Sequence, residues 1–201
     1  MAVSSEAAGR RYTYPDLATF PDDNLRREII DGDLVVNPAP ATRHQVASIR
    51  LAYRLVEYEL RVGGRALAAP YDILFALDNV VEPDLLFIRS DHLAQIGKNY
   101  MEGPPDLVIE ISSPSTRRLE LVRKRELYER FGVPEYWYVD LEVDRVEVYL
   151  LSEGRYPRPA LKFAGETLEP AGLPGLKVGA AEALAIEPEG QTTSSPPPKP
   201  E

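Results

Sequence analysis

The chain of 201 residues contains no cysteine, which excludes disulfide bridges, thiol nucleophiles and cysteine-based zinc sites. It has only two histidines, so a histidine-rich metal centre is excluded as well. Any bound metal would need oxygen ligands, which favours Mg²⁺ or Mn²⁺. No run approaches the ~20 apolar residues of a membrane-spanning helix, and the first residues lack the apolar segment of a secretory signal. These absences predict a cytoplasmic protein with no membrane partner.

Several common catalytic motifs are missing too. The sequence has no Walker phosphate loop, no glycine-rich dinucleotide fingerprint and no G-x-S-x-G esterase turn. Its net charge of −9 argues against a protein whose whole surface binds nucleic acid. Contact with nucleic acid would therefore depend on a local basic patch.

The composition, with 44% hydrophobic residues, predicts one globular domain. We interpret residues 1–11 as a flexible leader and residues 12–186 as that single domain. The polar, proline-rich residues 187–201 predict a disordered tail. Within the domain, residues 155–186 are expected to form a small β-rich appendix.

The first half of the domain predicts a helix between short strands. Asp31-Gly32 is a strong hairpin dipeptide between two apolar runs. Over residues 43–62, apolar residues recur at helical spacing, which predicts an amphipathic helix ending at Gly63. The stretches 65–77 and 80–90 predict an antiparallel strand pair.

The second half predicts a strand at 106–112, a helix at roughly 116–131 and a strand at 135–140. Short joints between them imply a right-handed parallel crossover, and hence an α/β fold. Glu110 lies in the middle of the first, otherwise apolar strand. A buried carboxylate needs a partner, and two partners are open: a salt bridge to Arg or Lys, or a divalent cation.

Lys124 is a candidate for that partner. It shares a helix face with Leu127 and Tyr128, the face that must pack on the sheet. One interpretation is a side chain that extends to solvent or pairs with Glu120, four residues earlier. The other is a lysine that points back at Glu110, where it orients water or stabilises negative charge.

Two Pro-Asp steps open apolar strands, at Asp84 and at Asp106. For Asp106 we expect a solvated aspartate at the strand entrance, since Pro and Asp favour element boundaries. Asp84 differs from it only if its strand lies beside that of Glu110. Two carboxylates at neighbouring strand ends are able to hold Mg²⁺.

The combination of "IDGDLV", "VVEPDLLFI", "EISSPST", a following lysine and "LYERFGVPEYW" is specific. These stretches resemble the PD-(D/E)XK nuclease superfamily and, more closely, the Uma-type family of bacterial putative restriction endonucleases. The resemblance covers roughly residues 12–180. It implies an α/β, restriction-endonuclease-like core with a mixed central β-sheet flanked by helices.

By this resemblance Asp84 and Glu110 are catalytic metal ligands, together with the carbonyl of Ile111. The superfamily's usual lysine stands two residues after the second acid, where this chain has Ser112. The Uma-type pattern instead places it on the following helix, where Lys124 matches. The remaining positions that match family motifs, in supporting roles, are Glu28, His44, Asp72 and Glu120.

The implied reaction is hydrolysis of DNA phosphodiester bonds with Mg²⁺ or Mn²⁺. Arg117 and Arg118, at the predicted helix start beside the site, are candidates for phosphate contact. A homodimer fits this reaction because duplex cleavage commonly needs two sites. The alternative is a nuclease-fold protein that binds or scaffolds nucleic acid or protein without cleavage.

Overall fold

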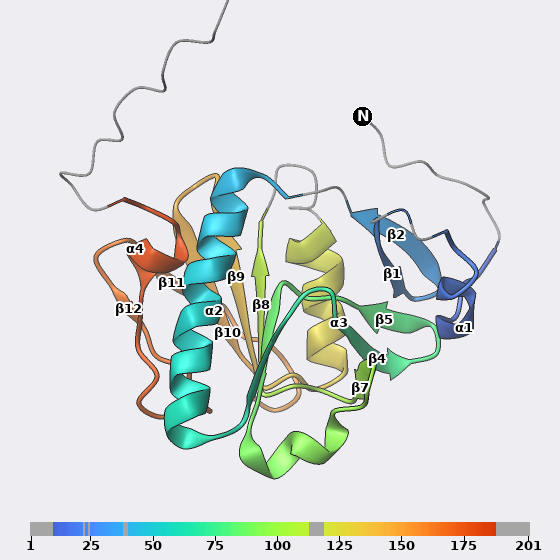
Figure 1. The fold of residues 1–201 in the computed structure, drawn as a ribbon. Helices are drawn as coiled ribbons and strands as arrows, with labels where there is room; N and C mark the ends of the chain where they lie inside the picture. The colour runs from blue at the N-terminus through green and yellow to red at the C-terminus, as the bar shows by residue number, and fades with distance from the viewer. Residues whose placement is uncertain (1–9, 22, 24, 38–39, 113–118, 188–201) are drawn as a thin grey trace, which may run out of the picture.

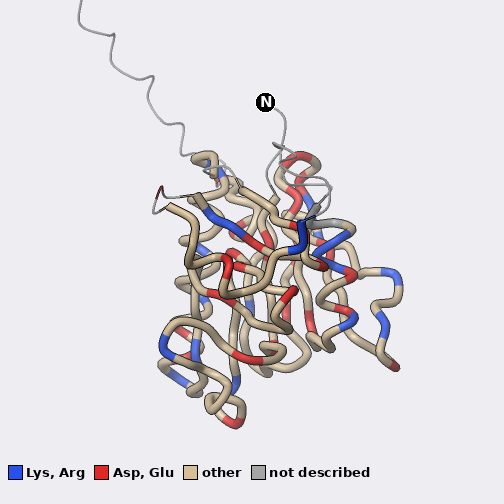
Figure 2. Tube along the Cα trace, turned by 90° about the vertical axis from the view of Figure 1, so that its right-hand side faces the viewer, with Lys and Arg blue, Asp and Glu red and all other residues tan. Residues whose placement is uncertain are grey.

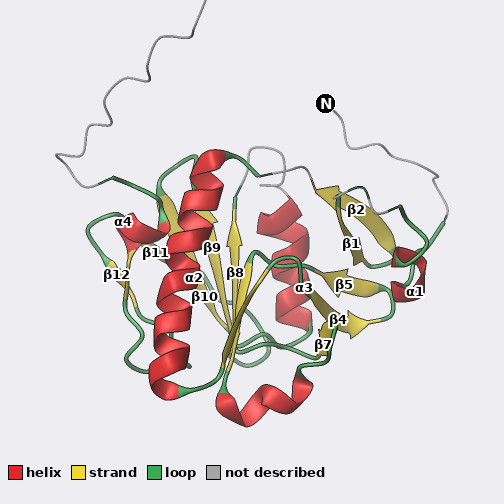
Figure 3. Cartoon of the chain, in the orientation of Figure 1, coloured by secondary structure: helices red, strands yellow, loops and turns green. Residues whose placement is uncertain are grey.

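The computed structural model describes residues 10–187 except 22, 24, 38–39 and 113–118. Its elements form two β-sheets with helices packed against them, which confirms the expected α/β class (Figure 1, Figure 3). The helical elements are α1 (Tyr14–Leu17), α2 (Thr42–Val62), η1 (Ser90–Gln95), η2 (Leu119–Lys124), α3 (Arg125–Arg130) and α4 (Ala180–Ala183).

The larger sheet has six strands in the order β11-β10-β9-β8-β6-β3. Its members are β3 (Arg65–Ala68), β6 (Leu85–Ile88), β8 (Leu107–Ile111), β9 (Glu135–Asp140), β10 (Arg145–Leu150) and β11 (Ala160–Lys162). Only β8 and β9 are parallel, so the sheet is mixed, as predicted. They are joined by the predicted strand–helix–strand crossover.

The smaller sheet was not predicted as a separate unit. It has five strands in the order β2-β1-β5-β4-β7. Its members are β1 (Arg26–Ile30), β2 (Asp33–Asn37), β4 (Asp72–Ala76), β5 (Asn79–Val81) and β7 (Tyr100–Glu102). The β1–β2 hairpin is the predicted one, and both turn residues, Asp31 (φ 52°) and Gly32 (φ 76°), are left-handed as a two-residue hairpin requires.

The expected antiparallel pair at 65–77 and 80–90 is divided between the two sheets. Strands β4 and β5 pair in the smaller sheet, whereas β3 and β6 pair in the larger one. Each stretch changes sheet at a proline, Pro70 in the first and Pro83 in the second. Proline lacks the N–H that continues a ladder, so a strand tends to end there.

The larger sheet separates two apolar cores. On one face lie α2 and the C-terminal segment, packed against Leu107, Ile109 and Ile111 of β8. On the other lie α3 and the smaller sheet, packed against Val108 (Figure 1). Since side chains alternate along a strand, Glu110 points to the same side as Val108, toward α3 and the smaller sheet.

Helix α2 is amphipathic, but the face that it buries is not the apolar face whose helical spacing in the sequence predicts the helix. The side chains packed inward are Ala47, Leu51, Leu55 and Tyr58, together with His44 near the start. The apolar residues Ile49, Tyr53, Val56 and Leu60 lie on the exposed side. The helix therefore carries two apolar faces, one of which remains in solvent in this chain.

The C-terminal segment is the expected appendix only in part. Strand β11 extends the larger sheet, while β12 (Thr167–Leu168) and β13 (Val178–Gly179) pair with each other. Among the residues that the structure describes, no helix combines the length and apolarity needed to cross a membrane.

Candidate active site

Glu110 lies on β8 with only 1% of its surface exposed. Its Oε1 atom accepts hydrogen bonds from Lys124 Nζ at 2.9 Å and from the Tyr128 hydroxyl at 2.6 Å. Lys124 thus points at Glu110, as the second of the two sequence interpretations predicts. Tyr128 was considered only as part of the apolar face, yet its ring is buried while its hydroxyl binds the carboxylate.

Lys124 is itself buried and lies between two carboxylates. Its Nζ is 2.8 Å from Glu28 Oε1 on β1, as well as 2.9 Å from Glu110. Glu28 is fully buried and accepts two further bonds, from the Glu82 N–H at 2.7 Å and from Asn37 Nδ2 at 2.6 Å. In this structure the counter-charge of Glu110 is therefore the lysine, in a buried ion pair.

The lysine reaches this position from an unusual turn. It ends η2, a π-helical segment, where α3 begins. Two surface ion pairs join this helical segment to the β1–β2 hairpin: Arg123 to Asp33 at 2.9 Å and Arg130 to Asp31 at 2.6 Å. Wide turns of this kind are frequent at functional sites.

Asp84 immediately precedes β6, which pairs antiparallel with β8 in a register that matches Leu85 with Ile109. Continued by one residue, that register sets Asp84 opposite Glu110. The Asp84 carboxylate accepts the Ile111 N–H at 2.9 Å and contacts His44 Nε2 at 3.1 Å. Arg26 donates to its other oxygen at 3.0 Å. Burial opposes ionisation of Asp84, but these partners outweigh it and lower its pKa to about 2.

Glu82 and Arg26 complete the cluster, and neither was identified from the sequence. Arg26 Nε donates to the Glu82 carboxylate at 3.2 Å, and the same guanidinium donates to the Glu82 carbonyl oxygen. Burial raises the pKa of Glu82, and Arg26 offsets part of that rise. The available signals were positional: Glu82 stands directly before Pro83-Asp84, and Arg26 stands two residues before Glu28 on one strand.

The cluster carries more acids than bases. Burial, followed by the charges of Glu82 and Glu28, raises the pKa of Asp72 at the start of β4 to about 7. Burial also raises the pKa of Glu110, and the nearby Asp84 and Glu28 add to that rise. Against two basic side chains, Arg26 and Lys124, stand the carboxyl groups of Glu28, Asp72, Glu82, Asp84 and Glu110. This excess favours binding of a further cation.

A cavity of about 460 Å³ opens beside the cluster. Arg26, His44, Glu82 and Asp84 lie in its wall, together with apolar residues such as Pro40 and Pro70. His44 is 7% exposed, and its Nδ1 atom has no hydrogen-bond partner among the residues that the structure describes. The cavity therefore leads from solvent to the side of Asp84 that His44 and Arg26 hold.

A family model matches residues 11–187, the Uma2 family, whose description is "Putative restriction endonuclease". The chain belongs to the Uma2 family. A crystal structure of a putative nuclease belonging to DUF820 from Anabaena variabilis ATCC 29413 is similar to it, with a TM-score of 0.74 at 16% sequence identity. That similarity covers 87% of this chain and 98% of the other, and at this identity it shows the fold alone. No curated protein matches the chain.

Not every residue predicted for the site lies in the cluster of this Uma2 chain. Ser112 Oγ accepts the Leu141 N–H at 2.9 Å, a structural contact at the end of β8. Arg117 and Arg118 lie outside the described residues, as does the side chain of Glu120. The structure therefore tests neither the phosphate contacts nor the Glu120–Lys124 pair.

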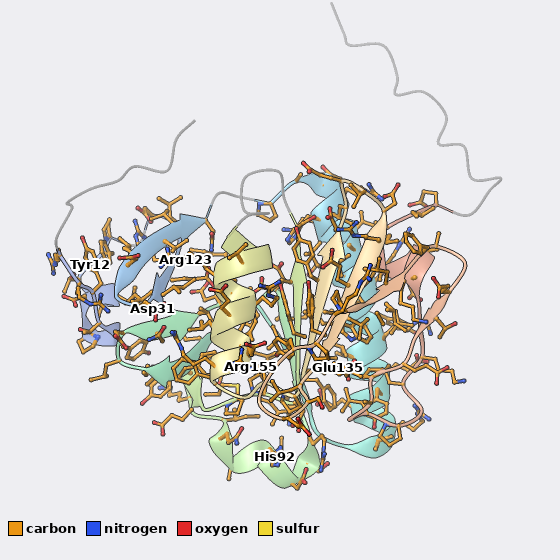
Figure 4. All side chains as sticks on the ribbon, turned by 180° about the vertical axis from the view of Figure 1, so that it is seen from behind. Tyr12, Asp31, His92, Arg123, Glu135 and Arg155 are labelled. Carbon is orange, nitrogen blue, oxygen red and sulfur yellow. The ribbon has the colours of Figure 1, made fainter. Side chains whose placement is uncertain are left out.

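The expectation of a solvated Asp106 is wrong. Its side chain is 5% exposed and accepts the Arg89 N–H at 2.8 Å, and His92 Nδ1 is 3.0 Å away. This second Pro-Asp step thus secures the loop that leads into η1. Figure 4 shows His92 on η1, at the end of the molecule away from the β1–β2 hairpin. Neither of these side chains contacts the acid cluster.

The donor set suits a hard divalent cation. Within the described part of the chain, no three His, Asp or Glu side chains are grouped as a ready metal site. A site with two carboxylates and one backbone carbonyl is compatible with this, because Mg²⁺ keeps several waters and often takes only one or two carboxylates. Acidic and basic residues are interspersed along the chain on the side shown in Figure 2.

Proposed function

We propose that this Uma2 protein is a metal-dependent endonuclease that hydrolyses phosphodiester bonds in DNA. The observation that carries the proposal is the convergence of Asp84, Glu110 and Lys124 from three elements of the fold at one end of the larger sheet. Membership of a family described as restriction endonucleases supports the reaction class. We further propose a cytoplasmic protein that acts as a homodimer, since cutting both strands of a duplex requires two sites.

In this proposal Mg²⁺ or Mn²⁺ is held by the carboxylates of Asp84 and Glu110 and by the Ile111 carbonyl. When bound, such a cation stabilises negative charge on a phosphoryl oxygen and lowers the pKa of a water. Lys124 orients the attacking water and stabilises developing negative charge. Glu28 acts through Lys124: its carboxylate, fixed by three hydrogen bonds, keeps the ammonium group directed at Glu110.

Three further residues have positioning roles. His44 and Arg26 bind the Asp84 carboxylate and keep it ionised, which a metal ligand must be. Asp72 lies near Glu82 and Glu28, and burial followed by the charges of these two acids raises its pKa to about 7. Binding of a cation nearby would favour the ionised form of this carboxyl group.

The alternative, a nuclease-fold protein that binds or scaffolds without cutting, is favoured by one observation. The Glu110 carboxylate is already neutralised by Lys124 and capped by the Tyr128 hydroxyl, so its burial requires no metal. Buried pairs of this kind often contribute nothing net to stability, and their presence does not require catalysis.

Cleavage assays separate these functions. The protein is incubated with single- and double-stranded DNA in Mg²⁺ or Mn²⁺, beside Asp84→Asn and Lys124→Met. The matched control is Asp106→Asn, which alters the other buried Pro-Asp carboxylate away from the cluster. We expect cleavage by the wild type and by the control, and loss of cleavage in both site variants.

Metal binding is measured separately by titration calorimetry with Mn²⁺. Wild type should bind more tightly than Glu110→Gln, because the amide lacks the charge that a divalent ion requires. Equal affinities would contradict the ligand assignment. Absence of cleavage by the wild type on every DNA substrate, with the fold intact by circular dichroism, would favour the scaffold.

A further inference from the structure

The outer face of α2 carries an apolar stripe formed by Ile49, Tyr53, Val56 and Leu60. Their exposed fractions are 67%, 61%, 43% and 82%. The stripe lies opposite the helix face that packs on the larger sheet, so it is not an edge of the core. Together these side chains form a contiguous patch on the order of 400 Å², a size at which apolar patches mark interaction sites.

The spacing of this stripe reads the same in both directions along the helix. Its members are separated by four, three and four residues. If two copies of α2 pack antiparallel around a two-fold axis, Ile49 faces Leu60 of the other copy and Tyr53 faces Val56. A symmetric interface of this type must be self-complementary, and a palindromic stripe satisfies that condition.

The surface shape and the flanking charges agree with this pairing. A shallow hollow of about 310 Å³ is lined by Tyr53, Val56, Glu57, Leu60 and Arg61, next to the stripe. It is able to receive an apolar side chain from an opposing helix. Such insertion of a side chain between four neighbours is how paired helices pack.

Glu57 borders the stripe, with 54% of its side chain exposed. In the antiparallel arrangement it comes to the level of Ala52 of the other copy, about 3 Å along the axis from the levels of Arg50 and Arg54. Both arginines lie on the same flank as Glu57, and in an antiparallel pair like flanks meet. Within one chain Arg50 pairs with Glu187 and Arg54 with Glu182, each at 2.8 Å, so the two flanks meet without unpaired like charges.

We propose that this Uma2 chain forms a symmetric dimer through antiparallel packing of the outer faces of α2. The occupant of the stripe is a second copy of the same chain. The stripe supplies roughly half of the ~800 Å² that each partner buries in a standard interface, so we expect the dimer to be weak, with a dissociation constant in the micromolar range or weaker. The dimer surface lies on α2 and does not depend on whether the acid cluster cleaves DNA.

Sedimentation velocity of the full chain between about 1 and 300 μM tests the dimer over the expected range of affinity. Leu60→Glu should weaken dimerisation by at least about tenfold, because the substitution acts twice in a symmetric interface. The matched control is Leu77→Glu, another exposed leucine, which lies at the β4–β5 turn and is 60% exposed. It should leave dimerisation unchanged.

Cysteine cross-linking tests the register, and the absence of native cysteine makes each product unambiguous. A mixture of Ile49→Cys and Leu60→Cys chains should form a mixed disulfide, since these positions face each other. Ile49→Cys alone should not form a disulfide with itself. A monomer at every concentration, a dimer unaffected by Leu60→Glu, or self-linking of Ile49→Cys would each overturn the proposal. Because neither assay involves DNA or metal, the proposal stands or falls separately from the cleavage assay.

Discussion

Replacing Lys124 by methionine removes the positive charge between two buried carboxylates. The Lys124 ammonium is 2.8 Å from Glu28 and 2.9 Å from Glu110, and both acids are at most 1% exposed. Without it the two oxygens lie within about 6 Å of each other, where two unit charges repel by about 3 kcal/mol at an effective dielectric constant of about 20. Breaking a buried ion pair typically costs about 3–5 kcal/mol. We expect the free energy of unfolding at pH 8 to fall by that amount.

The loss should depend on pH. Burial already raises the pKa of Glu110 above its ordinary value of 4.5, and the charge of Lys124 offsets that rise more than the hydrogen bond from Tyr128 does. Removing Lys124 raises this pKa further in the folded state. A carboxyl group whose folded pKa exceeds its unfolded pKa costs stability only above the unfolded pKa, where the unfolded chain ionises more readily than the folded one. The penalty is therefore absent below about pH 4.5 and grows as the pH rises through the folded pKa.

Urea unfolding followed by circular dichroism, in EDTA at pH 5, 6.5 and 8, measures this effect. The control is Lys177→Met, which removes an exposed lysine that lies 3.1 Å from Glu169 and should cost at most about 1 kcal/mol. Adding Glu110→Gln to Lys124→Met should recover part of the loss at pH 8, because one repelling charge disappears. A loss that is the same at all three pH values, or no larger than in the control, would refute the electrostatic reasoning.

Three further predictions concern single side chains. In EDTA, Asp72→Asn should raise the free energy of unfolding by about 1–2 kcal/mol at pH 8 and leave it unchanged near pH 3, because the Asp72 pKa of about 7 means that its ionisation costs stability only at high pH. Equal effects at the two pH values in denaturant titrations would contradict this. Arg26→Met should lower the free energy of unfolding more at pH 6 than at pH 2, because Arg26 binds Asp84, whose pKa is lowered to about 2 and which stabilises the fold only while ionised. When the circular dichroism signal is followed during acid titration, the variant should unfold at a higher pH than the wild type. Ser112→Ala should lower the free energy of unfolding by about 1 kcal/mol, because the hydrogen bond from the Leu141 N–H is lost, and should leave DNA cleavage intact. Loss of cleavage in a folded variant would show that Ser112 takes part in the reaction.

The pairing of Glu110 with Lys124 was predictable because it depends on local geometry. Helical periodicity places Lys124 on the face that carries Tyr128, and one short crossover returns that face to β8. The opposite position of Asp84 also follows once β6 and β8 are neighbours. The resemblance to the Uma-type family placed all three residues in one site, and the structure shows how each element brings its side chain there.

Arg26 and Glu82 were not predictable in this way, because their positions depend on the smaller sheet. Strand β1 meets β5 through Ile29 and Val80, two residues that are far apart in the sequence. Nothing in the pattern of either strand indicates that pairing. The orientation of α2 was missed for a related reason: the helix has two apolar faces, and periodicity alone does not decide which one packs on the sheet.

The wide separation of the site residues along the chain has a consequence for biosynthesis. Glu28 has its lysine counter-charge only once Lys124 is made, and Lys124 leaves the ribosome about 5–20 s after Glu28 at ordinary elongation rates. No earlier fragment contains both the acids and the cation. A ribosome-bound chain therefore carries an incomplete site, and a chain truncated before η2 would be a partial fold without the charge balance that the complete cluster has.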